Sequence, residues 1–121
     1  MINGLVPFVH VRSVERSIAF YETLGFAVND TFEPDGTVAW AFLEREQARI
    51  MLTLADAPID AGAQAVVFWL YAPDLEGFHA HLTEAGVGPG PIVDGAPGPP
   101  REFRLEDPDG YVLMVSRGDE T

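Results

Sequence analysis

The sequence predicts an α+β domain built from two tandem βαβββ halves, and three observations carry this prediction. The chain has 121 residues, 47% of them hydrophobic, which is the size of one ordinary domain with a buried core. A segment beginning at Val6 recurs at Val67, and the end of each half recurs at a similar spacing. Each repeat combines strand-like alternation with helix-like spacing of apolar residues.

The front of each half is expected to form a strand, a helix and a turn. The segment VPFVHVRSVERSIAFYETLGF lies over VFWLYAPDLEGFHAHLTEAGV at a constant offset of 61 residues. Alternation and helical spacing predict these elements: strands over 5–11 and 66–71, helices over 13–24 and 74–85. Ser13 and Asp74 are the expected N-caps. Gly25 and Gly86 stand where a left-handed residue ends a helix.

The back of each half is expected to form a hairpin. FLEREQARIML lies over RLEDPDGYVLM at an offset of 62, which makes Leu52 the counterpart of Met114. The turns fall at 45–48 and 107–110, and the second has Pro and Gly at turn positions. With these hairpins each half becomes βαβββ.

The expected boundaries place the halves at about 5–55 and 64–117, within one domain covering 1–121. Additional strands are expected near 39–43 and 102–105. A stretch rich in Gly and Pro follows the second helix, over 86–100. A loop of that length is either functional or a rigid surface crossover, and both interpretations stay open.

The charge balance excludes several classes of partner. The chain has 19 Asp and Glu against 7 Arg and no Lys, with a formal net charge of −12. This charge repels phosphate backbones and anionic lipids, so no nucleic-acid or membrane partner is expected. It can attract cationic small molecules, although an excess of acid that only confers solubility is the favoured interpretation. Without cysteine or a long apolar run, the protein is expected to be cytoplasmic.

Three motifs occur in order within these matching halves: RSVERSIAFYETLGF, APDLEGFHAHLTEAG and REFRLEDPDGYVLMV. Together they resemble the glyoxalase, bleomycin-resistance and extradiol-dioxygenase superfamily, also called the vicinal oxygen chelate superfamily. The resemblance covers about Val6 to Ser116. It implies sheets that curl around a central cavity and, usually, a homodimer. The chain departs from the family pattern at Tyr111, where Asn is usual after the turn glycine.

Catalytic members of that superfamily hold a divalent metal with His or Glu from four strand positions. Carried over one by one, these positions fall on Val6, Leu52, Val67 and Met114, and none of them binds a hard cation. A register shifted by one residue offers Thr53 at best. The resemblance therefore implies that no metal is bound, and no other cofactor is expected.

The three histidines do not rebuild a metal site. His79 and His81 lie two apart in the second helix, hence on different faces, and are expected to be exposed to solvent. His10 shares strand parity with Val6 and Phe8. It could be a hydrogen-bond donor to a ligand, a general base, or a satisfied polar residue. The chain lacks Cys and Lys nucleophiles, so no catalytic residue is assigned and a non-enzyme is favoured.

The remaining side chains favour an apolar and aromatic small-molecule pocket. The candidate ligand-binding residues are Phe8, His10, Trp40, Phe42, Leu52, Trp69, Tyr71 and Met114. Aromatic faces stack on planar ligands and attract cationic ones. The alternative is that Phe8, Trp69 and Tyr71 are only sheet core.

The resulting hypothesis is a metal-independent binding protein that sequesters an aromatic compound, cationic as one option, such as an antibiotic. The sequence is most similar in character to the bleomycin-resistance proteins, which bind an antibiotic without altering it. Two alternatives remain. One is a metal-dependent lyase, isomerase or dioxygenase of the same superfamily, and the other is a non-catalytic dimeric interaction module.

Overall fold

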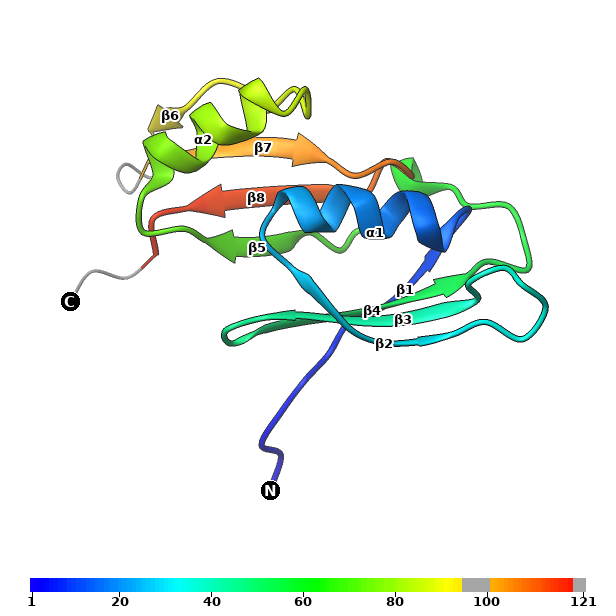
Figure 1. Ribbon diagram of the computed structural model, residues 1–121. Helices are drawn as coiled ribbons and strands as arrows, with labels where there is room; N and C mark the ends of the chain where they lie inside the picture. The colour runs from blue at the N-terminus through cyan, green and yellow to red at the C-terminus, as the bar shows by residue number, and fades with distance from the viewer. Residues whose placement is uncertain (95–100, 119–121) are drawn as a thin grey trace. The chain divides into compact units, whose positions relative to one another are not determined.

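The chain forms two compact units. The structure, a computed structural model, describes residues 1–94 and 101–118. Unit 1 is Met1–Ile59 and unit 2 is Asp60–Thr121, and each has one ten-residue α-helix and a four-stranded mixed sheet (Figure 1). The expected α+β class with two βαβββ halves is confirmed. That the halves make a single domain around a central cavity stays a prediction.

Unit 1 contains β1 (Phe8–Val11), α1 (Val14–Thr23), β2 (Ala27–Phe32), β3 (Trp40–Arg45) and β4 (Ala48–Leu54). The strand order is β1-β4-β3-β2, with β1 parallel to β4 and the other pairs antiparallel. The sequence analysis did not place β2. All six residues of β2 are exposed. Its sequence AVNDTF therefore lacks the alternation of apolar and polar residues by which a half-buried strand is recognised.

Unit 2 repeats the plan after a short 3-10 turn. Its elements are η1 (Ala61–Ala63), β5 (Phe68–Tyr71), α2 (Leu75–Glu84), β6 (Val93–Asp94), β7 (Arg101–Glu106) and β8 (Val112–Ser116). The strand order is β5-β8-β7-β6, and β5 is parallel to β8. The stretch 86–100 thus contains the short strand β6, which pairs with β7. Its residues 95–100 lie outside the described part of the chain.

Both helices have the predicted N-caps, and each helix begins and ends within one residue of its predicted bounds. The Ser13 side chain accepts a hydrogen bond from the backbone amide three residues later, at 3.2 Å, and Asp74 does the same at 3.1 Å. Each capping oxygen satisfies one of the free amides of a first helical turn. Gly25 and Gly86 follow the helices with φ of 102° and 80°, a left-handed conformation that favours glycine.

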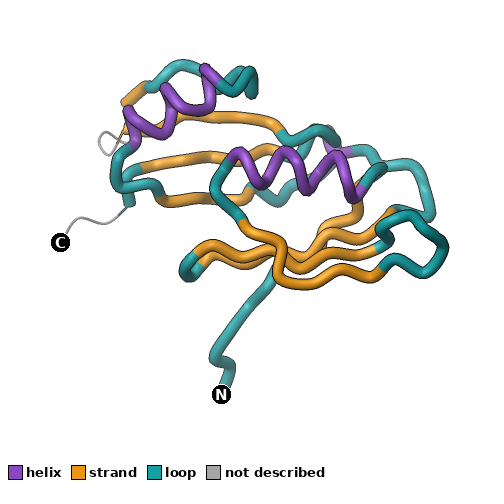
Figure 2. The backbone as a smooth tube through the Cα atoms, in the orientation of Figure 1, coloured by secondary structure: helices purple, strands orange, loops and turns teal. Residues whose placement is uncertain are grey.

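In each unit the helix lies over one face of its own sheet (Figure 2), and the buried side chains lie between the two. In unit 1 the buried residues are Val9, Val11, Val14, Ser17, Tyr21, Phe26, Ala41, Leu43, Ile50 and Leu52. In unit 2 the buried apolar residues are Leu75, Leu82, Phe103, Leu105, Leu113 and Val115. Since strand side chains alternate between faces, the other face of each sheet is not covered by the helix of its own unit.

The two hairpins differ in length by one residue. Glu44 pairs with Arg49 across the first turn, whereas Glu106 pairs with Val112 across the second, so the second turn has one more residue between its paired ends. The repeat offset therefore changes from 62 before the turn to 63 after it. A slip of one residue moves every side chain of a strand to the opposite face.

The expected equivalence of Leu52 and Met114 is consequently wrong. Trp69 pairs with Met114, and at the matching place in unit 1 Phe8 pairs with Met51. Met51 is thus the counterpart of Met114. Leu52 pairs with Val9 and lies with it on the buried face.

The longer turn is held by one side chain. Asp107 Oδ1 accepts hydrogen bonds from the amides of Asp109 and Tyr111, both at 2.9 Å. The Asp107 amide donates to the Tyr111 carbonyl at 3.0 Å, and Gly110 has φ of 93°. Tyr in place of the family's usual Asn therefore leaves a closed and regularly hydrogen-bonded turn.

Candidate functional site

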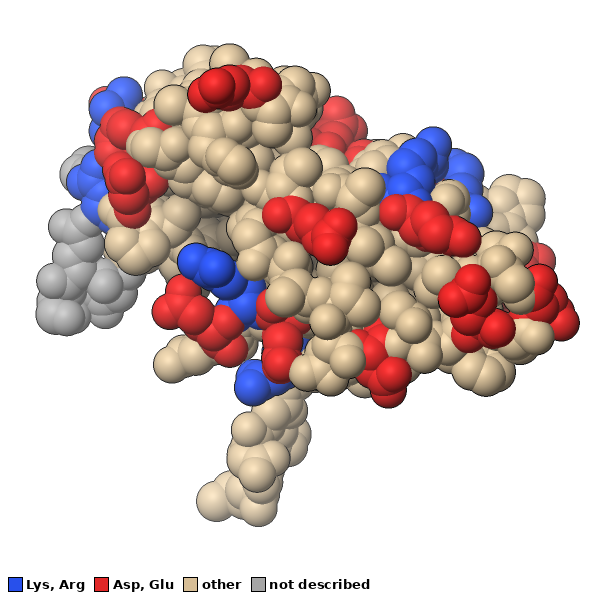
Figure 3. All heavy atoms as spheres, viewed as in Figure 1, with Lys and Arg blue, Asp and Glu red and all other residues tan. Residues whose placement is uncertain are grey.

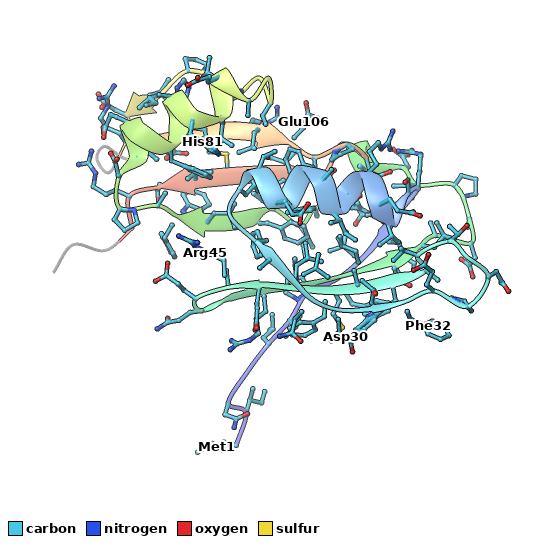
Figure 4. All side chains as sticks on the ribbon, viewed as in Figure 1. Met1, Asp30, Phe32, Arg45, His81 and Glu106 are labelled. Atoms are coloured by element: carbon cyan, nitrogen blue, oxygen red, sulfur yellow. The ribbon has the colours of Figure 1, made fainter. Side chains whose placement is uncertain are left out.

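Each sheet has one face that its own helix does not cover, which we call the open face of that unit. Pairing register assigns side chains to it, because directly paired residues share a face. On the open face of unit 1 lie Phe8, His10, Ala27, Asp30, Phe32, Trp40, Phe42, Glu44, Arg49, Met51 and Thr53. Figure 4 shows Asp30 and Phe32 on the side of the sheet away from α1.

The open face of unit 1 is aromatic from one edge strand to the other. Phe8 on β1 is 55% exposed and Phe32 on β2 is 58% exposed. Between them, the half-buried rings of Trp40 and Phe42 have centroids 6.5 Å apart. The His10 ring meets Phe8 edge to face at 5.7 Å. Exposed aromatic side chains that gather on one face in this way are typical of a binding site.

The open face of unit 2 is divided into an aromatic side and a charged side. Trp69 and Tyr71 on β5 are 49% and 69% exposed. Met114 on β8 lies between Trp69 and Arg104, which belongs to β7 at the other side. Arg104 Nη1 stands 3.6 Å from a carboxylate oxygen of Glu106. The exposure of Phe8, Trp69 and Tyr71 disagrees with the alternative that these three side chains belong only to the core of the sheets.

One aromatic side chain of unit 2 is held by a polar contact. The indole Nε1 of Trp69 donates a hydrogen bond to Ser116 Oγ at 3.0 Å, and Ser116 is buried. Ser116 and Met51 were not predicted from the sequence, and Thr53 on the other unit was named only as what a register shifted by one residue would offer. The unequal length of the two turns was the signal that would have found Met51.

Seven of the eight expected ligand-binding residues lie on open faces. Unit 1 brings together Phe8, His10, Trp40 and Phe42, and unit 2 brings together Trp69, Tyr71 and Met114. The eighth, Leu52, is fully buried on the side of α1. Its assignment to the site came from the offset of 62 and is corrected here. That the others bind a ligand stays a prediction.

The Glyoxalase/Bleomycin resistance protein/Dioxygenase superfamily model matches residues 5–115. The chain belongs to this superfamily. No curated protein matches the sequence.

Solved structures of other proteins share the fold of this superfamily member. The crystal structure of a bleomycin resistance determinant encoded on the transposon Tn5 has a TM-score of 0.80 and 21% identity, covering 98% of this chain and 99% of that one. A bleomycin-binding protein complexed with bleomycin has a TM-score of 0.79, 21% identity, and coverage of 98% and 100%. A third structure is a mutant of the fosfomycin resistance protein FosX from Listeria monocytogenes, complexed with Mn(II) and 1S,2S-dihydroxypropylphosphonic acid. It has a TM-score of 0.73 and 16% identity, covering 99% of this chain and 94% of that one.

The side chains present do not fit the divalent metal that catalytic superfamily members hold. Val6 and Val67 precede β1 and β5, and both are apolar. The corrected register brings Met51 and Thr53 to the open face, but a thioether and a hydroxyl are poor ligands for hard cations. Within residues 1–94 and 101–118, no three His, Asp or Glu side chains gather closely enough to hold a metal ion.

The helix histidines of this superfamily member have unequal surroundings. His79 is half-buried, with its Nε2 2.8 Å from the Gly90 carbonyl oxygen and its ring edge-on to Phe103 at 5.0 Å. The expectation of an exposed His79 is therefore wrong. His81 is exposed, as expected. The contact with Gly90 ties α2 to the segment that leads into β6, which is a structural role.

Charged side chains lie on the open faces beside the aromatic ones, among them Arg104 on unit 2 and a linked group on unit 1. On unit 1, Glu44 accepts a hydrogen bond from the Asn29 amide at 2.6 Å and stands 3.5 Å from Arg49. Acidic side chains are scattered over the visible surface instead of gathering in one patch (Figure 3). In the described residues, no helix has the length and apolarity needed to span a membrane.

The end of β8 is anchored to α2 by an ion pair. Arg117 Nη2 lies 2.9 and 2.8 Å from the two carboxylate oxygens of Glu76. A backbone hydrogen bond at Glu76, followed by the hydrogen bond from Arg117, holds the pKa of this carboxyl below its ordinary value. Glu76 also lies in the first turn of α2, where a negative charge complements the helix dipole.

Proposed function

We propose that this superfamily member is a metal-independent binding protein that sequesters an aromatic, positively charged small molecule such as an antibiotic. The observation that carries the proposal is the set of exposed rings on the open faces, above all Phe8, Trp69 and Tyr71. Exposed aromatic side chains offer flat faces for stacking, and water leaves their surfaces when a planar ligand binds.

The positive charge of the ligand is inferred from one carboxylate beside the rings of unit 1 and from the net charge of the chain. Asp30 lies beside Phe42 on the open face of unit 1, and the whole chain has a net charge of −12. A cation over an aromatic ring gains electrostatic energy from the ring, and a nearby carboxylate adds to it. An anionic ligand would meet repulsion at the same place.

A structural relative suggests the first compound to test. The bleomycin-binding protein that shares this fold was crystallised with bleomycin. Bleomycin is therefore the first probe, beside the planar cation proflavine and the aromatic anion 1-anilinonaphthalene-8-sulfonate. The three probes separate recognition of an antibiotic from recognition of an aromatic cation or of any aromatic compound.

The experiment is a titration of the intrinsic fluorescence of the two tryptophans. We expect saturable quenching by bleomycin or proflavine, and weaker binding of the anion. Trp69→Ala should weaken binding of the same probe. Absence of saturable quenching with all three probes would contradict the proposal.

A matched pair of carboxylate variants tests the charge argument. Asp30→Asn removes a carboxylate from the open face, and Asp35→Asn removes one from the exposed turn after β2. Both change the net charge equally. We expect only Asp30→Asn to weaken proflavine binding, and equal effects would mean that the net charge alone attracts the ligand.

Metal independence has its own test, because FosX shares the fold and was crystallised with Mn(II). Protein purified without chelators is analysed for manganese, iron, nickel and zinc. We expect less than stoichiometric metal and unchanged probe binding after dialysis against EDTA. Stoichiometric metal would favour the metal-dependent enzyme instead.

We also propose that two copies associate as a homodimer, because a chain with this many exposed apolar side chains buries part of them by association. Sedimentation equilibrium should give twice the 13.2 kDa mass of the chain. A dimer that binds none of the three probes would favour the interaction module. The cytoplasmic location stays a prediction.

A further inference from the structure

We propose that the segment Ser116–Gly118 positions the rings of Trp69 and Tyr71 for ligand stacking, and that Ser116 sets the plane of the Trp69 indole. The inference deepens the proposed function and rests on it for the role in binding. The positioning itself is a property of the free protein. It can therefore be tested with no ligand present.

Ser116 is the residue that fixes Trp69. Its hydroxyl accepts the indole N–H at 3.0 Å, and it is only 2% exposed, whereas Trp69 is 49% exposed. One edge of the indole is thus bonded to the sheet while much of the ring stays accessible. An aromatic ring held in one orientation loses less conformational entropy when a ligand stacks on it.

Gly118 provides room for Tyr71. A Cβ at Gly118 would lie 3.1 to 3.3 Å from the Cβ and ring atoms of Tyr71, and Gly118 has φ of 91°. Any larger residue would therefore meet the tyrosine side chain and also adopt a strained backbone conformation. The ring of Tyr71 lies directly against the backbone of the segment as a result.

Arg117 and a backbone hydrogen bond anchor the segment between these two contacts. Arg117 binds both carboxylate oxygens of Glu76 on α2. The Ala72 amide, next to Tyr71, donates to the Ser116 carbonyl at 2.9 Å. Three consecutive residues therefore have separate tasks: one bonds the indole, one binds the helix and one makes space for the phenol ring.

The matching place in unit 1 is built differently. The counterpart of Ser116 is Thr53, whose hydroxyl is directed to the Ala39 carbonyl at 3.4 Å. The counterpart of Trp69 is Phe8, which has no N–H to donate. A hydrogen bond donated by the aromatic side chain is thus a feature of unit 2 and not a general consequence of the repeated fold.

The first test uses the indole N–H signals of ¹⁵N-labelled protein without ligand, with Trp40→Phe to assign the signal of Trp69. In the wild type we expect slow exchange of the Trp69 indole proton with water. Ser116→Ala should shift this signal upfield and speed its exchange, and Ser116→Thr should restore both. An unchanged signal in Ser116→Ala would overturn the positioning role.

The second test measures proflavine affinity in a double-mutant cycle. Ser116→Ala should weaken binding about threefold to tenfold, the value of one ordinary hydrogen bond. In a Trp69→Phe background, which has no indole N–H, the same change should have no further effect. Equal losses in both backgrounds would show a merely structural effect and overturn the inference.

Two further variants make the outcome decisive. Ser17→Ala removes another fully buried serine, on α1, and should leave affinity unchanged. If Ser116→Ala does not fold, Gly118→Ala should weaken binding in the wild type but not in a Tyr71→Ala background. A wild type that binds none of the three probes contradicts the proposed function, whereas the indole signal still decides whether Ser116 holds Trp69.

Discussion

Neighbouring residues of this chain have opposite roles, and Met51 and Leu52 are the clearest pair. Leu52 is fully buried between its sheet and α1, whereas Met51 lies half-buried on the open face beside Phe8. The two side chains are similar in size and hydrophobicity. Only their strand parity separates a core residue from a candidate binding residue.

This assignment can be tested by stability. Leu52→Ala should lower the free energy of unfolding by about 2–5 kcal/mol, because it leaves a cavity in the core. Met51→Ala should lower it by about 1 kcal/mol or less and should weaken probe binding instead. Urea unfolding followed by circular dichroism measures both. Equal destabilisation by the two variants would refute the register.

At the residue scale, local chemistry was predictable and long-range contacts were not. Ser13 and Asp74 cap their helices because a cap depends only on the next three residues. His79 was expected to be exposed. Its partner Gly90 comes from a Gly-rich and Pro-rich stretch whose path the sequence does not define.

At the scale of elements, strands with an apolar face were predictable and polar edge strands were not. β3 and β4 have alternating buried residues, and both coincide with expected strands. β2 and β6 are exposed throughout, so no periodicity marked them. The site was predictable to the same extent. Within one strand the sequence assigned side chains to the correct face, but after a turn of unknown length it assigned Leu52 to the wrong face.

The second hairpin turn depends on Asp107, and this gives a further prediction. Asp107→Ala should cost about 2–4 kcal/mol of stability, since two backbone amides lose their acceptor in a turn where Asp107 and Asp109 are buried. Asp35→Ala, in the exposed turn after β2, is the control and should change stability by about 0.5 kcal/mol or less. Thermal unfolding distinguishes them, and similar melting temperatures for the two variants would be inconsistent with the described turn.

The ion pair between β8 and α2 predicts a pH dependence. The pKa of Glu76 in the folded protein is below its ordinary value, so the unfolded chain binds the proton more tightly. The contribution of ionised Glu76 to the stability of the fold is therefore present above the ordinary pKa of a glutamate. It is lost as the pH falls through the lower pKa of the folded protein. We expect the melting temperature of the wild type to exceed that of Glu76→Gln at neutral pH, and the difference to disappear in acid. A difference that persists in acid would exclude this origin.

For the whole molecule, the net charge of −12 acts on any charged ligand before contact. Proflavine affinity should fall as salt rises to about 1 M, where the Debye length is about 3 Å. Stacking should survive, so binding should weaken without vanishing. Fluorescence titrations across the salt series measure this, and an affinity independent of salt would mean that charge has no part in recognition.

The unequal hairpins also have an evolutionary consequence. The first turn is one residue shorter than the second, yet both hairpins keep the same face buried, with Ile50 and Leu52 matching Leu113 and Val115. A change of one residue in turn length is thus compatible with an unchanged core, because burial of one face specifies the register of a strand. Homologues that differ in turn length should therefore be aligned separately on each side of the turn, since one constant offset would assign core residues to the open face.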